Sequence, residues 1–261
     1  IMMDSKDILV IEDEALVADA VVKVCSSDGL TMTVVDNAAE GLRQLEKRRF
    51  HLVLSDIMLP EMDGFGFLGE VGNRGIDTPV VMMTGYSTME NAVRSLNLGA
   101  TDYIPKPFTA DELLSVVYRA LRCGELLRKA SANGSGHDDM TYVAPPSDFY
   151  RLGHISWVML EDEGTARIGL NDLFLKSVTD MHSIELDEVA DELVQGTYCA
   201  AVESGAGWTH QVLCPMGGEI LEVNEAVRSK LSLLEKDPYF RGWLYRILPA
   251  HPENNLRWLS L

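Results

Sequence analysis

The stretch HLVLSD, residues 51–56, decides the fold class of this chain. It is a short apolar run that ends in an acidic residue, Asp56, and such a run bounded by turn residues is typical of a buried strand in a parallel sheet. The runs ILVI and VVMM have the same character and are followed by Glu12 and Asp13 and by Thr84, and the segment YIPKPF contains Lys106 after a similar short stretch. We therefore predict an α/β fold in which four strand ends converge on one crevice.

These residue types predict a particular chemistry for the crevice. Three clustered carboxylates suit a hard divalent cation such as Mg²⁺, which prefers oxygen ligands and keeps several waters. Asp56 can then act as a nucleophile toward a phosphoryl group, because aspartyl phosphates are established covalent intermediates. Lys106 would supply a positive charge and Thr84 a hydroxyl to the phosphoryl oxygens. Any one of these residues alone is more simply a solvated loop residue or a helix cap, so the prediction depends on the whole set.

Residues 5–122 resemble the receiver domain of two-component response regulators. The resemblance is carried by Glu12-Asp13, by SDIMLPEMDGFGFL around Asp56, by VVMMTGY around Thr84 and by TDYIPKPF around Lys106. It implies a doubly wound, flavodoxin-like sheet of five parallel strands with five helices. It also implies that a sensor histidine kinase or a phosphotransfer protein phosphorylates Asp56, and that the domain can remove the phosphoryl group itself.

The same resemblance implies roles for further residues. Mg²⁺ would be held by the carboxylates of Asp13 and Asp56, by the main-chain carbonyl of Met58 and by waters that Glu12 positions. Thr84 and Tyr103 would form the switch pair, in which the hydroxyl moves onto the phosphoryl group and the aromatic ring turns inward.

Charge and hydropathy restrict the remaining functions. The chain of 261 residues has 40 acidic and 22 basic residues, a formal charge of −18, and acidic residues predominate in both halves. Because nucleic-acid binding depends largely on cationic contacts to phosphates, we expect no nucleic-acid partner. The sequence has no apolar run long enough to cross a membrane and no signal peptide at its start, so we expect a cytoplasmic chain without membrane insertion.

A helix-capping motif and a stretch rich in Gly and Ser divide the rest of the chain. A helix beginning near Asp111, with a capping box formed by Thr109 and Glu112, is expected to continue toward Lys129. Residues 130–140 (ASANGSGHDDM) are predicted to be a flexible linker. The predicted domains are thus residues 5–122, a helical extension and linker at 123–147, and a second domain at 148–261. We expect the four cysteines to be free thiols, and we disfavour a disulfide or metal site at Cys199 and Cys214.

The second domain contains many short strands and few helices, which favours a small barrel or sandwich. Residues 153–261 resemble the H protein of the glycine cleavage system, through GHISWV, ARIGLND, ELVQG, AVES, CPMGGEILEVNEAV and DPYFRGWLYRI. The resemblance implies a mostly β, flattened barrel of the lipoyl type with flanking helices. It also implies a hairpin tip at which that family carries lipoate on a lysine.

The lipoylated lysine is missing from this chain. In the family it lies two residues after the pair that is Glu203-Ser204 in this sequence, a position occupied by Ala206 or, after a shift of one residue, by Gly207. Residues 177–229 contain no lysine. Because lipoate attaches through a lysine amine, we predict that lipoate is absent and that the hairpin has no cofactor-binding role.

Aromatic and histidine residues near the hairpin have simpler interpretations. Trp208, beside the tip, is a candidate contact for a protein partner, although the alternative that it folds back onto the barrel is favoured. Three other tryptophans are assigned to the core: Trp157, Trp243 and Trp258. The histidines His154 and His182 lack companions at metal-ligand spacing and are interpreted as structural or surface residues.

Three functions follow, in decreasing order of support. The first is a phosphorylation-controlled regulator, not a stand-alone enzyme, whose non-lipoylated second domain binds an unknown protein partner. The second is a regulator that docks with glycine cleavage or lipoate-handling enzymes. The third is a transcriptional regulator, which the acidity of the chain and the lack of a basic stripe disfavour.

Overall fold

The computed structural model describes residues 6–86, 88–132, 142–205 and 207–261. The chain divides into two compact units, with the main division between residues 128 and 129. The two units are described one after the other.

The first unit is built on a parallel sheet of five strands in the order β2-β1-β3-β4-β5. The strands are β1 (Asp7–Ile11), β2 (Thr31–Val35), β3 (Leu52–Asp56), β4 (Val80–Thr84) and β5 (Asp102–Pro105). The helices that alternate with them along the chain are α1 (Ala15–Ser27), α2 (Ala38–Lys47), α3 (Gly64–Asn73), α4 (Met89–Asn97) and α5 (Ala110–Ala132). The predicted α/β fold with a five-stranded parallel sheet is confirmed.

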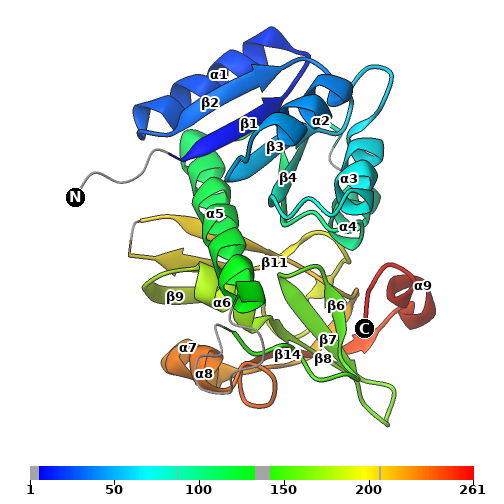
Figure 1. Cartoon of the computed structure of the whole chain (residues 1–261). Helices are drawn as coiled ribbons and strands as arrows, with labels where there is room; N and C mark the ends of the chain where they lie inside the picture. Colours follow the sequence, from blue (N-terminus) through cyan, green and yellow to red (C-terminus); the bar gives the residue numbers. More distant parts are fainter. Residues whose placement is uncertain (1–5, 87, 133–141, 206) are drawn as a thin grey trace. The chain divides into compact units, whose positions relative to one another are not determined.

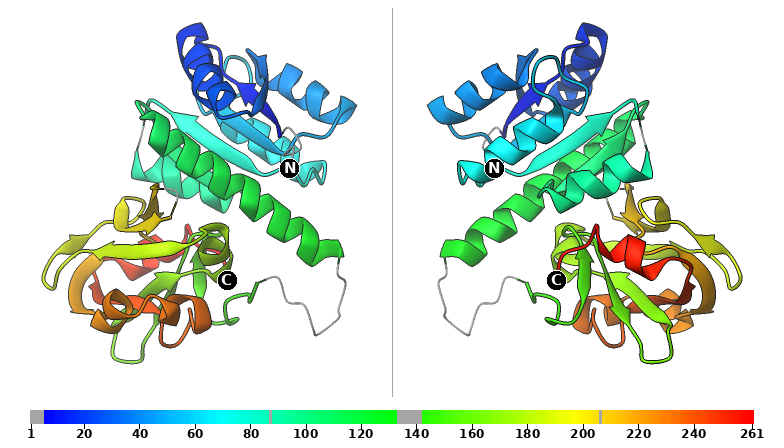
Figure 2. Two further views of the ribbon diagram at one scale, coloured as in Figure 1. Left: turned by 90° about the vertical axis from the view of Figure 1, so that its left-hand side faces the viewer. Right: turned by 90° about the vertical axis from the view of Figure 1, so that its right-hand side faces the viewer.

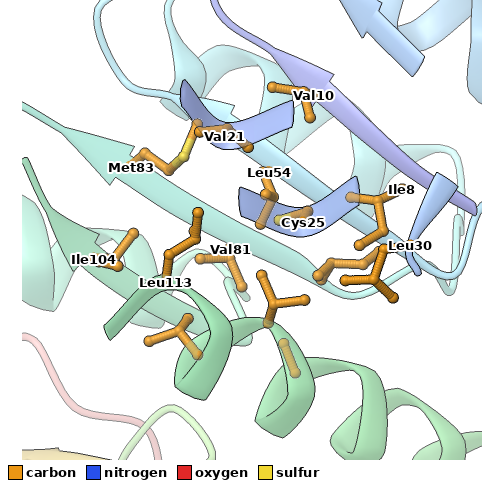
Figure 3. Packing of buried hydrophobic residues seen from close by; sticks show 14 of the residues in the cluster. Ile8, Val10, Val21, Cys25, Leu30, Leu54, Val81, Met83, Ile104 and Leu113 are labelled. Atoms are coloured by element: carbon orange, nitrogen blue, oxygen red, sulfur yellow. The ribbon is translucent and has the colours of Figure 1, made fainter. Parts of the chain in front are cut away.

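One face of this sheet packs against α1 and α5 (Figure 3). Val10 and Leu54 from the central strands meet Val21 and Cys25 of α1, while Leu113 belongs to α5. Full burial of a side chain of this size contributes about 1.5–3 kcal/mol. The near-continuous apolar runs seen in the sequence are explained, because β3 and β4 are buried along their whole length.

Helix α5 is continuous over 23 residues (Figure 2). Its capping box is present, since the Thr109 amide donates to the Glu112 carboxylate at 2.7 Å and the Glu112 amide donates to Thr109 Oγ1 at 3.2 Å. The helix ends at Ala132, beyond Lys129. Most of the predicted linker, residues 130–140, lies outside the described residues, and the domain limits set from the sequence stay predictions.

The second unit is mostly antiparallel β structure that curls into a half-barrel (Figure 1). Its six-stranded sheet has the order β10-β13-β14-β8-β7-β6 and its three-stranded sheet the order β12-β11-β9. The strands are β6 (Tyr150–Leu152), β7 (Ser156–Leu160), β8 (Ala166–Leu170), β9 (Met181–Leu186), β10 (Glu192–Leu193), β11 (Tyr198–Ser204), β12 (Thr209–Leu213), β13 (Gly218–Val223) and β14 (Trp243–Pro249). The short helices are α6 (Asp172–Ser177), α7 (Glu225–Ser229), α8 (Ser232–Lys236) and α9 (Pro252–Leu256). The predicted mostly β, lipoyl-type fold is confirmed.

Aromatic residues form one part of the core of this unit. Trp157 is fully buried against Phe149 and Tyr239, and the partly buried Trp243 packs on the same cluster. The assignment of Trp258 to the core was wrong, since its side chain is 36% exposed. Trp258 follows the short helix α9, which buries no residue, so nothing draws this side chain inward.

Two further findings concern the described parts of both units. None of their helices combines the length and the apolar character needed to cross a membrane. All four cysteines are free and buried. Burial raises the thiol pKa of Cys25 and of Cys123 to about 12, while a hydrogen bond with Cys214 and burial raise that of Cys199.

Candidate functional site

The carboxyl ends of adjacent parallel strands bring the predicted residues to one edge of the first sheet. Asp56 is the last residue of β3 and Thr84 the last of β4, while Glu12 follows β1 and Lys106 follows β5. Because β1, β3, β4 and β5 are consecutive neighbours in the sheet, their ends form a single edge. The structure therefore brings these four side chains together, as the spacing of the apolar runs predicts.

Lys106 joins two buried carboxylates. Its Nζ donates to Glu12 Oε2 at 2.6 Å and to Asp56 Oδ2 at 2.8 Å. Glu12 is 2% exposed and Asp56 is 3% exposed. The other Asp56 oxygen, Oδ1, accepts a hydrogen bond from the Met58 amide at 3.2 Å. Both oxygens of Asp56 are thus held in place on a rigid strand end.

The electrostatics of this cluster follow from burial and proximity. Burial raises the pKa of Glu12, and the charge of Asp56 raises it further, while Lys106 opposes the shift. Burial by itself would lower the pKa of Lys106, but the hydrogen bonds and charges of Asp56 and Glu12 together outweigh it and raise that pKa. Lys106 is therefore a cation at neutral pH, held against two carboxyl groups.

The acidic residues also form a group that could bind a metal ion. One carboxylate oxygen from each of Glu12, Asp13 and Asp56 lies within 4.8 Å of the others. Asp13 is exposed, so the group opens to solvent on one side. A group of oxygen ligands that is open to solvent on one side suits Mg²⁺, because that ion prefers oxygen ligands and keeps part of its water shell. The donor set fits the predicted ion.

The predicted switch residues occupy different environments. Thr84 is buried, and its Oγ1 accepts a hydrogen bond from the Tyr86 amide at 3.0 Å. Its main-chain oxygen accepts from the Lys106 amide at 2.7 Å, which ties the ends of β4 and β5 together. Tyr103, within β5, is 5% exposed, so its ring is turned into the protein. Their action as a switch stays a prediction.

Gly64 is a positioning residue that the sequence reasoning missed. It begins α3, and a β-carbon at this position would lie 2.3 Å from the Asp56 main-chain oxygen and 2.8 Å from Ile57 Cα. Its amide donates to the Ile57 carbonyl at 2.8 Å. Only a glycine allows α3 to begin so close to the backbone of Asp56. The sequence signal was the DG pair at residues 63–64, which also supplies Asp63 as the helix N-cap.

The hairpin between β11 and β12 lies in the second unit. The Ser204 amide donates to the Trp208 carbonyl at 3.0 Å, and the Gly207 amide donates to the Ser204 carbonyl at 2.9 Å. Gly207 has a φ of +78°, which favours glycine, and Trp208 is half-buried. Ala206, the first candidate for the lipoyl-lysine position, lies outside the described residues. The absence of lipoate and the partner role of Trp208 stay predictions.

Comparison with protein families supports both resemblances. Residues 8–118 match the model of the response regulator receiver domain, and residues 149–260 match that of the glycine cleavage H-protein. Together with its fold and acidic strand-end site, the first match defines the first unit as a receiver-type α/β domain. The chain thus contains a response regulator receiver domain at residues 8–118 and, after it, a glycine cleavage H-protein domain at residues 149–260.

Similar curated proteins match about half of this chain. The transcriptional regulatory protein DltR of Streptococcus agalactiae serotype III (strain NEM316) is 37% identical over 121 residues, which are 46% of this chain and 54% of that protein. The DNA-binding transcriptional regulator NtrC of Escherichia coli (strain K12) is 36% identical over 146 residues, or 55% of this chain and 31% of that protein. The chain thus spans about half the length of the first relative and about a third of the second.

Two solved structures are similar to parts of this chain. A CheY-like receiver domain protein from Methanospirillum hungatei JF-1 is 34% identical, with a TM-score of 0.45, and the match covers 47% of this chain and 98% of that one. A glycine cleavage system H protein from Mycobacterium marinum is 27% identical, with a TM-score of 0.38, over 40% of this chain and 86% of that one.

Proposed function

We propose that this chain is a two-component response regulator, phosphorylated on Asp56 by a histidine kinase or a phosphotransfer protein. The observation that carries the proposal is the placement of Lys106 between the carboxylates of Asp56 and Glu12 at a shared strand-end edge. A cation in contact with a buried carboxylate can stabilise the charge of a phosphoryl group as it arrives. The match of residues 8–118 to the response regulator receiver domain supports the same role.

The residues act as follows in the proposed reaction. A carboxylate oxygen of Asp56 forms a bond to phosphorus while the bond from phosphorus to the donor's imidazole nitrogen breaks, and the imidazole keeps the electron pair. Lys106 would move its hydrogen bond from Asp56 to a phosphoryl oxygen. Thr84 would contribute its hydroxyl to another phosphoryl oxygen, and Tyr103 would complete the switch.

We assign the metal-holding role to the carboxylates of Asp13 and Asp56 and to the main-chain carbonyl of Met58, with Glu12 positioning waters. When bound, Mg²⁺ neutralises the charge that develops on phosphoryl oxygens. The side chains of Lys106 and Thr84 would bind and orient the phosphoryl group, and the main-chain amide of Met58 holds Asp56 Oδ1.

Phosphorylation is tested by intact mass. The full chain is incubated with Mg²⁺ and a small phosphodonor such as acetyl phosphate, and the gain of one phosphoryl group is measured. Asp56→Asn should abolish the gain, and Asp77→Asn, at an exposed position of the same unit, should leave it unchanged. Absence of a gain, or an equal gain in Asp56→Asn, would contradict the assignment.

For the output, the proposal is binding of a protein partner by the non-lipoylated second domain. The support is the lack of lysine in residues 177–229 together with the half-buried Trp208 beside the hairpin tip. On this proposal the chain acts in signalling and is not a stand-alone enzyme. Docking with glycine cleavage or lipoate-handling enzymes is the second candidate, which the H-protein match favours.

Transcriptional regulation is the third candidate, since relatives that match about half of this chain are named as transcriptional regulators. The net charge of −18 opposes contact with nucleic acid. A gel-shift with genomic DNA at physiological salt distinguishes this candidate, and specific retention of DNA would make transcriptional regulation the first candidate.

Partner binding is tested with purified proteins and with cell extract. Wild type, Asp56→Asn and Trp208→Ala are compared as baits, with Phe240→Ala, at an exposed aromatic residue elsewhere in the second unit, as a control. Loss of a partner in Trp208→Ala but not in Phe240→Ala supports the proposed surface. Intact mass of the protein from its native cell tests the cofactor, because a lipoyl adduct in the second domain would contradict its predicted absence.

A further inference from the structure

Ser55 is a polar residue in an otherwise apolar part of β3, the strand that ends at Asp56. Its exposed fraction is 0%. Leu52 and Leu54 belong to the core beside α1 and α5, so the alternation of side chains along a strand places Ser55 on the opposite face of the sheet. A buried hydroxyl is unfavourable unless it has a hydrogen-bonding partner, and that partner indicates what the hydroxyl does.

The hydroxyl of Ser55 contacts the main chain of the proposed phosphoacceptor. Its Oγ donates to the Asp56 main-chain oxygen at 3.1 Å. At the other end of the same peptide group, the Ile57 amide donates to the Met83 carbonyl at 3.0 Å. The peptide group that follows Asp56 is thus held at its carbonyl by Ser55 and at its N–H by β4.

The next peptide group is held in the same way. Its carbonyl, that of Ile57, accepts from the Gly64 amide at 2.8 Å, and its N–H, that of Met58, donates to Asp56 Oδ1 at 3.2 Å. The position of the Met58 amide therefore depends on the orientation of two successive peptide groups. Because this amide orients the Asp56 carboxylate, a rotation of either peptide group would displace the carboxylate.

Ser55 supplies the side-chain donor among these four hydrogen bonds, and the other three donors are main-chain amides. A main-chain amide is present whatever the residue type, unless the residue is proline. The donor to the Asp56 carbonyl, in contrast, exists only if residue 55 carries a hydroxyl. An apolar residue at this position would leave β3 apolar but would release one end of the first peptide group.

We infer that Ser55 is a positioning residue for the phosphorylation of Asp56 and acts through the Asp56 main-chain oxygen. The inference rests on the proposed phosphorylation of Asp56 and adds the requirement for a hydroxyl beside it. Because Ser55 is buried and bonded to the main chain, it sets the geometry of the attacking carboxylate and does not bind the phosphodonor. Its loss should therefore lower the rate at saturating donor and leave the half-saturating concentration of donor unchanged.

Variants of similar shape separate the hydroxyl from packing. Ser55→Thr and Ser55→Val have nearly the same shape and differ in the hydroxyl, and Ser55→Ala removes the hydroxyl without adding atoms. Ser95→Ala is the matched control. Ser95 is also 0% exposed, and its hydroxyl donates to the Asn91 carbonyl at 2.7 Å within α4.

The rate of mass gain is measured on the full chain with Mg²⁺ and a series of acetyl phosphate concentrations. We expect Ser55→Ala and Ser55→Val to lower the rate at saturation about 3- to 10-fold, the effect of losing one hydrogen bond, at an unchanged half-saturating concentration. Ser55→Thr and Ser95→Ala should react at the rate of wild type. In nuclear magnetic resonance spectra without phosphodonor, the Met58 amide signal should shift in Ser55→Val but keep its wild-type position in Ser55→Thr.

Equal rates in Ser55→Thr and Ser55→Val would overturn the inference, as would an unshifted Met58 signal in Ser55→Val. A lower stability of Ser55→Ala in urea with an unchanged rate at saturation would make Ser55 a structural residue only. No mass gain in wild type would contradict the phosphorylation itself and the inference with it, which distinguishes the two failures. If neither of the larger residues folds at position 55, the rate at saturation and the Met58 signal of Ser55→Ala decide alone.

Discussion

Replacing Gly64 with alanine should distort the proposed phosphoacceptor site by displacing the main chain at Asp56, without changing any of its polar side chains. The new β-carbon would lie 2.3 Å from the Asp56 main-chain oxygen, whereas ordinary contacts begin at 3.4 Å. Met82 Cε, at 2.6 Å, is the end of a flexible side chain and can move, but the contacts with the Asp56 oxygen and with Ile57 Cα, at 2.8 Å, are to the main chain. The end of β3 and the start of α3 must therefore separate by about 1 Å. Overpacking of this kind costs about 1–3 kcal/mol. A displacement of this size at a reacting group slows a reaction on the order of 100-fold.

Gly69→Ala is the matched control for this substitution. Gly69 lies in the same helix, but a β-carbon there meets no atom within 4 Å. Alanine is the better helix former, so Gly69→Ala should stabilise the protein by about 0.5–1 kcal/mol. Urea unfolding gives the two stabilities, and the rate of mass gain with acetyl phosphate gives the two activities. The reasoning fails if Gly64→Ala is as stable and as readily phosphorylated as Gly69→Ala.

Three further substitutions probe the charges of the first unit. Glu12→Gln should raise the free energy of unfolding at pH 7 without Mg²⁺, because the raised pKa of Glu12 in the folded state means that its ionisation costs more there than in the unfolded chain. The gain should vanish below about pH 4, where Glu12 of the wild type is protonated too. Urea unfolding from pH 4 to pH 7 measures the gain, and a gain that does not change with pH would contradict this reasoning. Asp102→Asn should lower the free energy of unfolding by about 3–5 kcal/mol, because it breaks the buried pair with Arg119, whose Nε donates to Asp102 at 2.8 Å. Glu46→Gln breaks an exposed pair with Arg74 and should cost less than about 1 kcal/mol. Equal unfolding temperatures of the two variants would refute this prediction. Lys106→Met should slow phosphorylation by acetyl phosphate about 100-fold, and a rate near that of wild type would remove this residue from the mechanism.

The sequence predicted the composition of the site because parallel strands impose a simple geometry. Each apolar run ends at the same edge of the sheet, so Asp56, Thr84 and Lys106 had to converge once the strands were recognised. The role of Gly64 could not be predicted in this way. Its importance comes from a close approach between α3 and β3, which is a distance in space and leaves no periodic signal in the chain.

The second unit was predicted mainly through its resemblance to a family, and its details show the limits of that route. Asn171 has the residue type of a helix cap, but its side-chain amide instead donates to the main-chain carbonyls of Gly153 and Ser156. Trp258 was assigned to the core because it matches or adjoins a position of the glycine cleavage H-protein family. It is partly exposed because the helix before it buries nothing, which no local pattern reveals.

Burial of all four cysteines has a practical consequence for labelling. Maleimides and disulfide reagents attack the thiolate and must reach the sulfur atom, which burial prevents, and the raised thiol pKa of Cys25, Cys123 and Cys199 leaves little thiolate on those three residues. The folded chain should therefore react very slowly with such reagents, and the appearance of reactive thiols would indicate that it has unfolded. A single cysteine introduced at the exposed residue Thr209, beside the hairpin tip, could then carry a fluorophore in an otherwise unaltered chain.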